Sequence, residues 1–302
     1  MNDKSCPWAA VIAGLALVSI AGRASAHDFW IEPSNFHAQT GERISVGLCI
    51  GDPFAGWSMA RNGARIEQFL VVGPAGERAI VGVDGSDPAG VTRLDAPGFY
   101  VIAYRSNDAF TELPPAKFAD YLLEKGLDDI AAGRTQQRPS QRPVREAFVR
   151  YAKSLLRAGG VSGAPVDRRI GFRFEILAEP SATVASGERP LTFRLLFEGK
   201  PLPNAQMTAT RRGAPESRIR ARTDTDGRAA LALPQAGVWQ IASVHMIEAP
   251  KGVVADYESL WASLTLEIPS QSPIVPAPAA PIATAHCDSR PAVAASLARP
   301  LP

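Results

Sequence analysis

The first part of the chain alternates short apolar stretches with turn residues. Between His27 and about Asn107, apolar residues cluster at 43–48, 68–72 and 98–104, and glycine and proline pairs separate the clusters. Strands rich in β-branched and aromatic residues, spaced at this interval, are typical of a β-sandwich. We therefore expect a first sandwich domain over residues 27–110.

The apolar period then changes to helical spacing. Phe118, Leu122 and Leu127 recur after Pro114-Pro115, which predicts a helix over 115–131. A second stripe starts after Pro143 and stops at Gly159-Gly160, and it predicts an amphipathic helix over 143–158. The stripe consists of Val144, Phe148, Tyr151, Ala152 and Leu155. We expect the two helices to be joined by a polar Arg/Gln linker.

Strand patterns return after Arg169, at 170–176, 191–197, 237–247 and 259–268. Beyond Pro269 the chain is rich in Pro, Ala and Ser without periodicity, which is typical of disorder. The predicted fold is mainly β, with two β-sandwich (immunoglobulin-like or transthyretin-like) domains and a two-helix insertion between them. The expected boundaries are a signal peptide at 1–26, domains at 27–110 and 161–269, a helical insertion at 111–160 and a disordered tail at 270–302.

The first 26 residues have the layout of a secretory signal peptide. Lys4 precedes an apolar run from Trp8 to Gly22, and the small residues Ala24-Ser25-Ala26 follow it. The run is shorter than the roughly 20 residues that a membrane-spanning helix needs. Cleavage after Ala26 would give a periplasmic or secreted protein that begins at His27 and has no integral membrane span.

Composition excludes some classes of partner. A formal net charge of +2, with 21% charged residues, argues against a nucleic-acid binder, which needs a concentrated basic face. We interpret the arginines between Arg134 and Arg157 as a solvated face. Of the three cysteines, Cys6 leaves with the signal peptide. We expect Cys49 to be a buried free thiol and Cys287 to be untethered, although an oxidising compartment would also allow a bridge between them.

His27 is the leading candidate for metal chemistry. As the mature N-terminus it would offer both an α-amine and an imidazole to one ion, and no internal histidine can do so. Nitrogen ligands favour copper or nickel over magnesium or calcium. The candidate third ligands are His245, which we favour, and His37, whereas His286 lies in the tail. The alternatives are that His27 is incidental and that His245 is a core histidine satisfied by a hydrogen bond.

Carboxylates near these histidines could add oxygen ligands or orient an imidazole. These are Asp28, Glu32, Asp256 and Glu258. Motifs of common enzymes are missing from the sequence, including G-x-S-x-G, a phosphate loop, H-E-x-x-H and C-x-x-C. We therefore expect a protein that is not an enzyme.

Several short motifs in order carry a family resemblance. They are His27–Pro33, Leu113–Ile130, Gly171–Ile176, Thr223–Ala229, Gly237–Met246 and Tyr257–Thr265. Together they resemble a bacterial periplasmic family of unknown function that is often labelled a nickel-uptake (NikM-like) substrate-specific component. The resemblance covers about residues 27–268 and implies nickel or cobalt handling. The second domain also resembles transthyretin-like and carboxypeptidase-regulatory-like β-sandwiches, which bears on fold and not on function.

The sequence thus predicts a periplasmic or secreted protein that binds a transition-metal ion (Cu, Ni or Co) through His27, with His245 or His37 as the further ligand. The expected role is uptake or delivery, with a membrane transporter or another envelope protein as partner. Two alternatives stay open, namely a non-enzymatic adhesion or assembly module without metal and a copper oxygenase with an N-terminal histidine brace.

Overall fold

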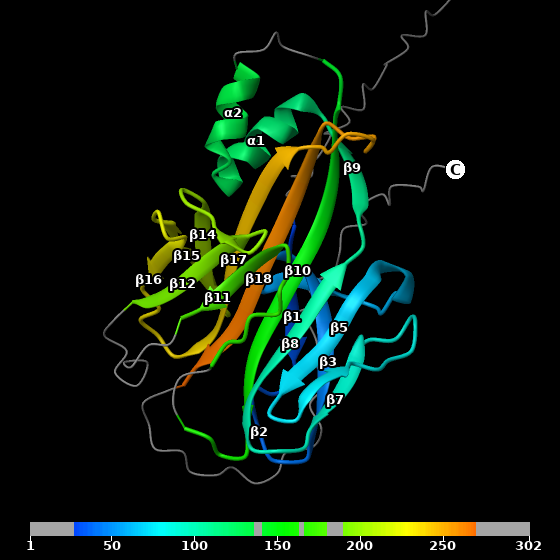
Figure 1. Cartoon of the computed structure of the whole chain (residues 1–302), viewed down its shortest axis with the longest axis vertical. Coiled ribbons are helices and arrows are strands. Elements are labelled where there is room, and N and C mark those ends of the chain that lie inside the picture. The colour runs from blue at the N-terminus through cyan, green and yellow to red at the C-terminus, as the bar shows by residue number, and fades with distance from the viewer. Residues whose placement is uncertain (1–26, 136–140, 163–165, 180–189, 270–302) are drawn as a thin grey trace, which may run out of the picture.

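The computed structural model of the chain describes residues 27–135, 141–162, 166–179 and 190–269. Within these residues the protein is built mainly from strands, which form three sheets (Figure 1). The described part thus has the mainly β, sandwich-like fold that the sequence predicts.

A ten-stranded sheet forms the centre of the molecule. Eight of its strands follow one another in space in the order β15 (Ala214–Arg222), β14 (Gln206–Arg211), β17 (Gly237–Glu248), β18 (Tyr257–Ile268), β10 (Val144–Ala158), β8 (Gly98–Ser106), β5 (Ile66–Gly73) and β6 (Gly76–Ala79). The short strands β2 (His37–Ala38) and β9 (Ala109–Leu113) also pair with β10. Neighbours run antiparallel except that β10 is parallel to β18 and to β2.

Two four-stranded sheets pack on the central sheet. One contains β1 (Asp28–Pro33), β3 (Glu42–Asp52), β4 (Ala55–Met59) and β7 (Gly90–Leu94). The other contains β11 (Phe174–Ala178), β12 (Leu191–Phe197), β13 (Lys200–Pro201) and β16 (Arg228–Leu231). A single turn of 3₁₀-helix, η1 (Gly63–Arg65), leads into β5.

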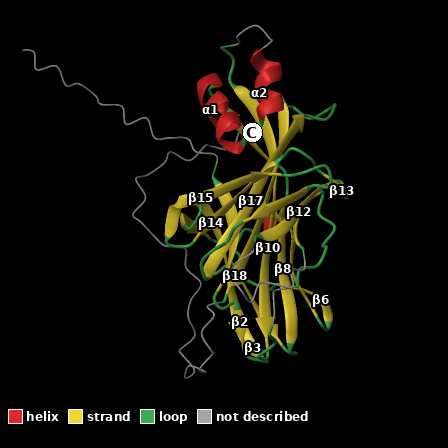
Figure 2. Cartoon of the chain, turned by 90° about the vertical axis from the view of Figure 1, so that its left-hand side faces the viewer, coloured by secondary structure: helices red, strands yellow, loops and turns green. Residues whose placement is uncertain are grey.

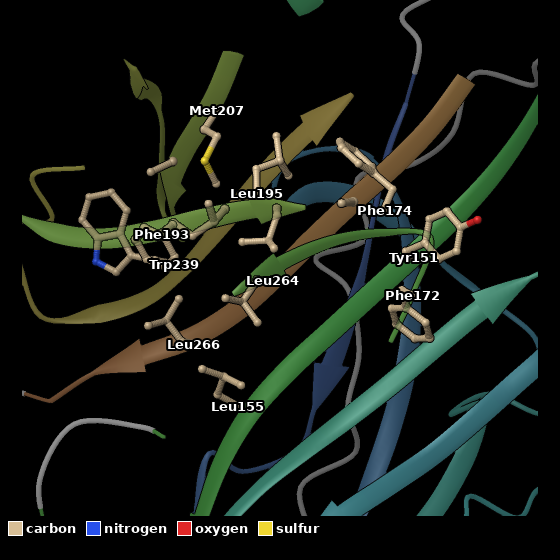
Figure 3. Packing of buried hydrophobic residues seen from close by; sticks show 14 of the residues in the cluster. Tyr151, Leu155, Phe172, Phe174, Phe193, Leu195, Met207, Trp239, Leu264 and Leu266 are labelled. Carbon is tan, nitrogen blue, oxygen red and sulfur yellow. The ribbon is translucent and has the colours of Figure 1, made fainter. Parts of the chain in front are cut away.

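The two largest apolar cores lie on opposite faces of β10 because side chains alternate along a strand. Tyr151 and Leu155 of β10 pack with Phe174, Phe193 and residues of β14, β17 and β18 (Figure 3). Ala152, Leu156 and Ala158 of the same strand pack instead with residues of β1, β3, β5 and β8. β10 is therefore buried on both faces over most of its length.

The sequence-predicted helix at 143–158 is wrong, because this segment is the strand β10. The first predicted helix is confirmed as two shorter ones, α1 (Pro115–Lys125) and α2 (Asp128–Thr135). Gly126 separates them in the left-handed conformation (φ 66°), in which a glycine ends a helix without a steric penalty. Figure 2 shows both helices together at one end of the molecule.

The central sheet takes strands from each of the segments 27–110, 111–160 and 161–269, so its hydrogen bonding continues across the expected boundaries. The division into domains stays a prediction. Among the described residues, no helix is long and apolar enough to cross a membrane. Residues 1–26 and 270–302, where we expect a signal peptide and a disordered tail, lie outside the described residues.

Cys49 differs from the expected free thiol. It is fully buried in β3 and is disulfide-bonded. The other two cysteines of the chain, Cys6 and Cys287, lie outside the described residues.

Candidate metal-binding site at His27

His27 lies immediately before β1, and strand register determines its neighbours. β1 pairs with β3 so that Asp28 lies opposite Gly51 and Phe29 opposite Ile50. Continuing this register by one residue places His27 opposite Asp52. His27 and Phe29 thus point to the same side of the sheet, and on that side the Phe29 ring packs in the core shared with β10.

The imidazole of His27 is half-buried against Trp57 of β4. The two ring centroids are 5.1 Å apart and the planes meet at 79°, an edge-to-face contact. Trp57 is itself 46% exposed, so this aromatic pair lies at the edge of the core. The Nδ1 atom of His27 is buried and has no hydrogen-bond partner among the described residues.

Burial lowers the pKa of His27 below its ordinary value. Asp52 opposes this effect, and the nearby Arg150 guanidinium reinforces it. The ring is therefore neutral at physiological pH, and a neutral imidazole is the form that binds metal ions.

Arg150 of β10 is the principal cation near His27. Its guanidinium lies over the rings of Phe148 (4.9 Å to the centroid) and Phe29 (5.5 Å). Burial lowers its pKa to about 10. For Arg150 this corrects the expectation that the arginines of this segment form a solvated face, because the segment is a strand that is covered on both faces over most of its length. Arg142 and Arg145 are exposed, as expected.

Asp28 is held by helix α1. Its carboxylate accepts a hydrogen bond from Lys125 Nζ at 3.0 Å, and both side chains are buried. Lys125 also lies over the ring of Trp261, 5.2 Å from the centroid. Because Asp28 is paired with the ammonium group of Lys125, we do not consider it a metal ligand.

A buried polar and aromatic layer supports this contact. Trp261 stacks on Tyr121 of α1, whose hydroxyl donates to Glu146 Oε1 at 3.1 Å. The Ser259 hydroxyl also contacts Glu146 and accepts a hydrogen bond from Trp261 Nε1 at 2.9 Å. Burial raises the pKa of Glu146, although the hydrogen bonds from Ser259 and Tyr121 oppose that effect. These contacts fix α1 against β10 and β18.

His37 lies far from His27. Its Nδ1 is 3.3 Å from Arg157 Nη2 and its Nε2 is 3.7 Å from Glu267. Arg157 is seven residues along β10 from Arg150, which at about 3.3 Å per residue is a separation of roughly 23 Å. Burial lowers the pKa of His37 to about 4.

His245 lies on the opposite face of the central sheet from β1. Its ring contacts Phe197 and Phe174, with centroids 4.6 and 5.9 Å away. Ala242 and Val244 of the same strand face the Asp28 and Lys125 side instead. The structure therefore brings neither His245 nor His37 to His27, and His286 lies outside the described residues.

The remaining carboxylates considered as ligands are paired with arginines. Glu32 contacts Arg212, Asp256 contacts Arg142, and Glu258 contacts Arg173. Across the described ranges, no group of three or more His, Cys, Asp or Glu side chains is arranged to hold a metal ion. What remains at the candidate site is His27 itself, with Asp52 opposite.

Sequence reasoning missed Asp52, Trp57 and Arg150 as neighbours of His27. Asp52 and Trp57 follow from the register between β1, β3 and β4, and a pattern of hydrophobic residues does not contain that register. Arg150 could have been found only by assigning residues 144–158 to a strand, because alternation would then have placed one face of the strand inside.

Comparisons with known proteins identify a family for this chain. No curated protein matches the chain. Among solved structures, the D0-D1 domain of Intimin is aligned over 79% of this chain and 97% of its own length, with 14% sequence identity and a TM-score of 0.19. A family model described as a domain of unknown function (DUF4198) matches residues 24–247, which include β1, the helices and most of β17. The chain thus belongs to the DUF4198 family.

Proposed function

We propose that, after removal of residues 1–26, this protein binds one transition-metal ion through the α-amine and Nδ1 of His27. The role would be uptake or delivery of nickel, cobalt or copper in the periplasm or outside the cell, in partnership with a membrane transporter or another envelope protein. The nickel-uptake label of the family that the sequence resembles agrees with this role. In the unprocessed chain the nitrogen of His27 is an amide, so the site exists only in the mature protein.

The unpartnered Nδ1 atom carries the proposal. Nδ1 is the ring nitrogen that lies within reach of the residue's own amine, and it is buried without a hydrogen bond among the described residues. A buried polar atom without a partner is unfavourable, and a ligand at that atom relieves the cost. The lowered pKa of His27 keeps the ring in its metal-binding form.

Asp52 is the natural source of an oxygen ligand. The strand register places it opposite His27, and it has the largest electrostatic influence on the pKa of the ring among the neighbouring charges. The donor set would therefore be two nitrogens and one carboxylate, which suits Cu(II), Ni(II) or Co(II) better than Mg²⁺ or Ca²⁺. A three-nitrogen brace of the oxygenase type is not proposed, since His37 and His245 lie elsewhere.

The experiment compares the mature protein with a version that carries one glycine before His27. The extra residue turns the amine into an amide and leaves the imidazole intact. We expect Cu(II) or Ni(II) affinity to fall by at least about tenfold, which corresponds to about 1.4 kcal/mol, and His27→Ala to weaken it similarly. His245→Ala is the matched control and should leave the affinity unchanged.

Equal affinity of the mature and extended proteins, measured by calorimetry or by competition with a chromogenic chelator, would rule out binding through the amine. Absence of metal binding in every form would favour a non-enzymatic adhesion or assembly module instead.

A further inference from the structure

Three ionisable side chains form a separate cluster in the apolar core between the central sheet and β11. Lys153 lies on β10 between Tyr151 and Leu155, two residues of this core, and Figure 3 shows Tyr151 close to Phe172 and Phe174. The partners of Lys153 are Asp167, before β11, and Glu175, within β11. The side chains of Lys153, Asp167 and Glu175 are 2%, 1% and 0% exposed.

The contact between the amine and the carboxyl of Asp167 is close and involves both oxygens. Lys153 Nζ lies 2.8 Å from Oδ1 and 2.9 Å from Oδ2 of Asp167, so it faces the carboxyl carbon between them. Glu175 Oε1 lies 3.1 Å from the same nitrogen. The carbonyl oxygens of Ile176 and Arg168, at 3.0 and 3.2 Å, also contact it.

Backbone amides hold both carboxyl groups in place. Ala178 and Arg168 donate to the two oxygens of Asp167 at 2.9 and 2.7 Å. Ile170 and Gly171 donate to the two oxygens of Glu175 at 2.7 and 3.0 Å. The three side chains therefore meet in one fixed arrangement, the condition under which an intramolecular reaction gains its largest rate advantage.

The cluster contains one amine and two carboxyl groups, so full ionisation would leave one net negative charge in the core. Burying an uncompensated charge is costly, and the group with the weaker stabilisation takes up a proton instead. Burial raises the pKa of Asp167, which favours its neutral acid form. Neutral Asp167 beside the Lys153–Glu175 pair gives a cluster without net charge.

We propose that Lys153 and Asp167 form an intramolecular isopeptide bond, with Glu175 as the catalytic group that transfers the proton. Glu175 first accepts a proton from the ammonium of Lys153. The resulting amine Nζ attacks Cγ of the protonated Asp167 carboxyl and forms the N–C bond. The attacking nitrogen loses a second proton, the C–OH bond breaks with protonation of the leaving oxygen, and one water molecule departs.

Atoms and charges balance in this condensation. The neutral amine and the carboxylic acid give an amide and one water, Glu175 keeps the proton that it took from the ammonium and ends as the neutral acid, and no oxidant or reductant takes part. The bond would tie β10 covalently to the segment before β11. It is independent of the metal-binding role of His27, because the two sites share no residue.

The test is tryptic peptide mapping of the folded, full-length protein. Trypsin cleaves after a lysine only when its amine is free, so the expected product is one branched peptide that joins Lys153 to Asp167. Its mass should be lower by one water than the sum of the two linear peptides. The Lys125–Asp28 pair is an internal control, since its second carboxylate, Glu124, is partly exposed, and Lys125 should be cleaved normally.

Two variants distinguish a covalent isopeptide bond from an ion pair. Glu175→Gln should lack the branched peptide, and Asp167→Asn should form the same amide with loss of ammonia instead of water. Free, cleavable Lys153 in folded wild-type protein would overturn the proposal, whether or not the variants fold. A branched peptide in Glu175→Gln would overturn the role given to Glu175.

Discussion

Lys125 and Asp28 form a buried ion pair between the last residue of α1 and the first residue of β1, with 3.0 Å between Nζ and Oδ1. The two residues are 97 positions apart in the chain. The pair fixes the start of β1, and therefore His27, against the helices. The proposed metal site would thus depend on tertiary packing of α1 as well as on the expected signal-peptide cleavage.

Lys125→Met should destabilise the protein strongly. It leaves Asp28 buried without its ammonium partner, and breaking one side of a buried pair typically costs about 3–5 kcal/mol. The matched control is Arg145→Ala, which removes an exposed pair with Glu112 and should cost less than about 1 kcal/mol. Urea unfolding of both variants measures the difference, and similar losses would contradict the importance of the Lys125–Asp28 contact.

The packing of α1 gives a second prediction. Phe118 is fully buried among Tyr121, Val244 and Tyr257, whereas Leu123 on the same helix is 69% exposed. Phe118→Ala should lower the free energy of unfolding by about 3–5 kcal/mol through loss of buried area and creation of a cavity. Leu123→Ala should change it by less than about 0.5 kcal/mol. A small effect at Phe118 would mean that α1 does not dock as described.

His37 should make stability depend on pH between about 4 and 6.5. Burial and the Arg157 guanidinium lower the pKa of His37 to about 4 in the folded protein, against a value near 6.5 in an unfolded chain. The unfolded state binds more protons in this window, so the free energy of unfolding falls as pH drops from 6.5 toward 4. Burial raises the pKa of Glu267. The contribution of Glu267 to the free energy of unfolding therefore increases as pH falls, which opposes the effect of His37.

The variant His37→Gln isolates this contribution because it keeps a polar side chain beside Arg157. Denaturant unfolding at a series of pH values should show a shallower slope for the variant between pH 6.5 and 4. Parallel curves for the variant and the wild type would show that His37 does not titrate with a lowered pKa.

Most strands and the first helical segment could be predicted from the sequence because their apolar residues cluster or recur at one period. β10 could not be predicted in this way. It is buried on both faces, and polar residues such as Glu146, Lys153 and Ser154 are buried in it beside apolar ones. The alternation of apolar and polar residues that marks a strand is therefore lost, and the remaining apolar positions fit a helical period by coincidence.

The candidate site could be predicted only in part, for a related reason. A signal peptide and a following histidine are local features, so His27 could be identified from sequence. The partners of His27 depend on which strands pair and on which face of the central sheet each residue lies. His245 shares the odd-numbered positions of β17 with Trp239 and Ile241, which pack on β11 and β12 and away from β1. A single sequence does not determine which face of the central sheet β1 covers.

The most direct test of the central claim is the metal content of the mature protein after export. The protein would be purified from an exporting host, its start at His27 confirmed by intact mass, and the bound Cu, Ni and Co measured by elemental analysis. We predict roughly one ion per chain in the mature protein and almost none in His27→Ala exported in the same way. Equal metal content in the two proteins, or none in either, would contradict metal binding at His27.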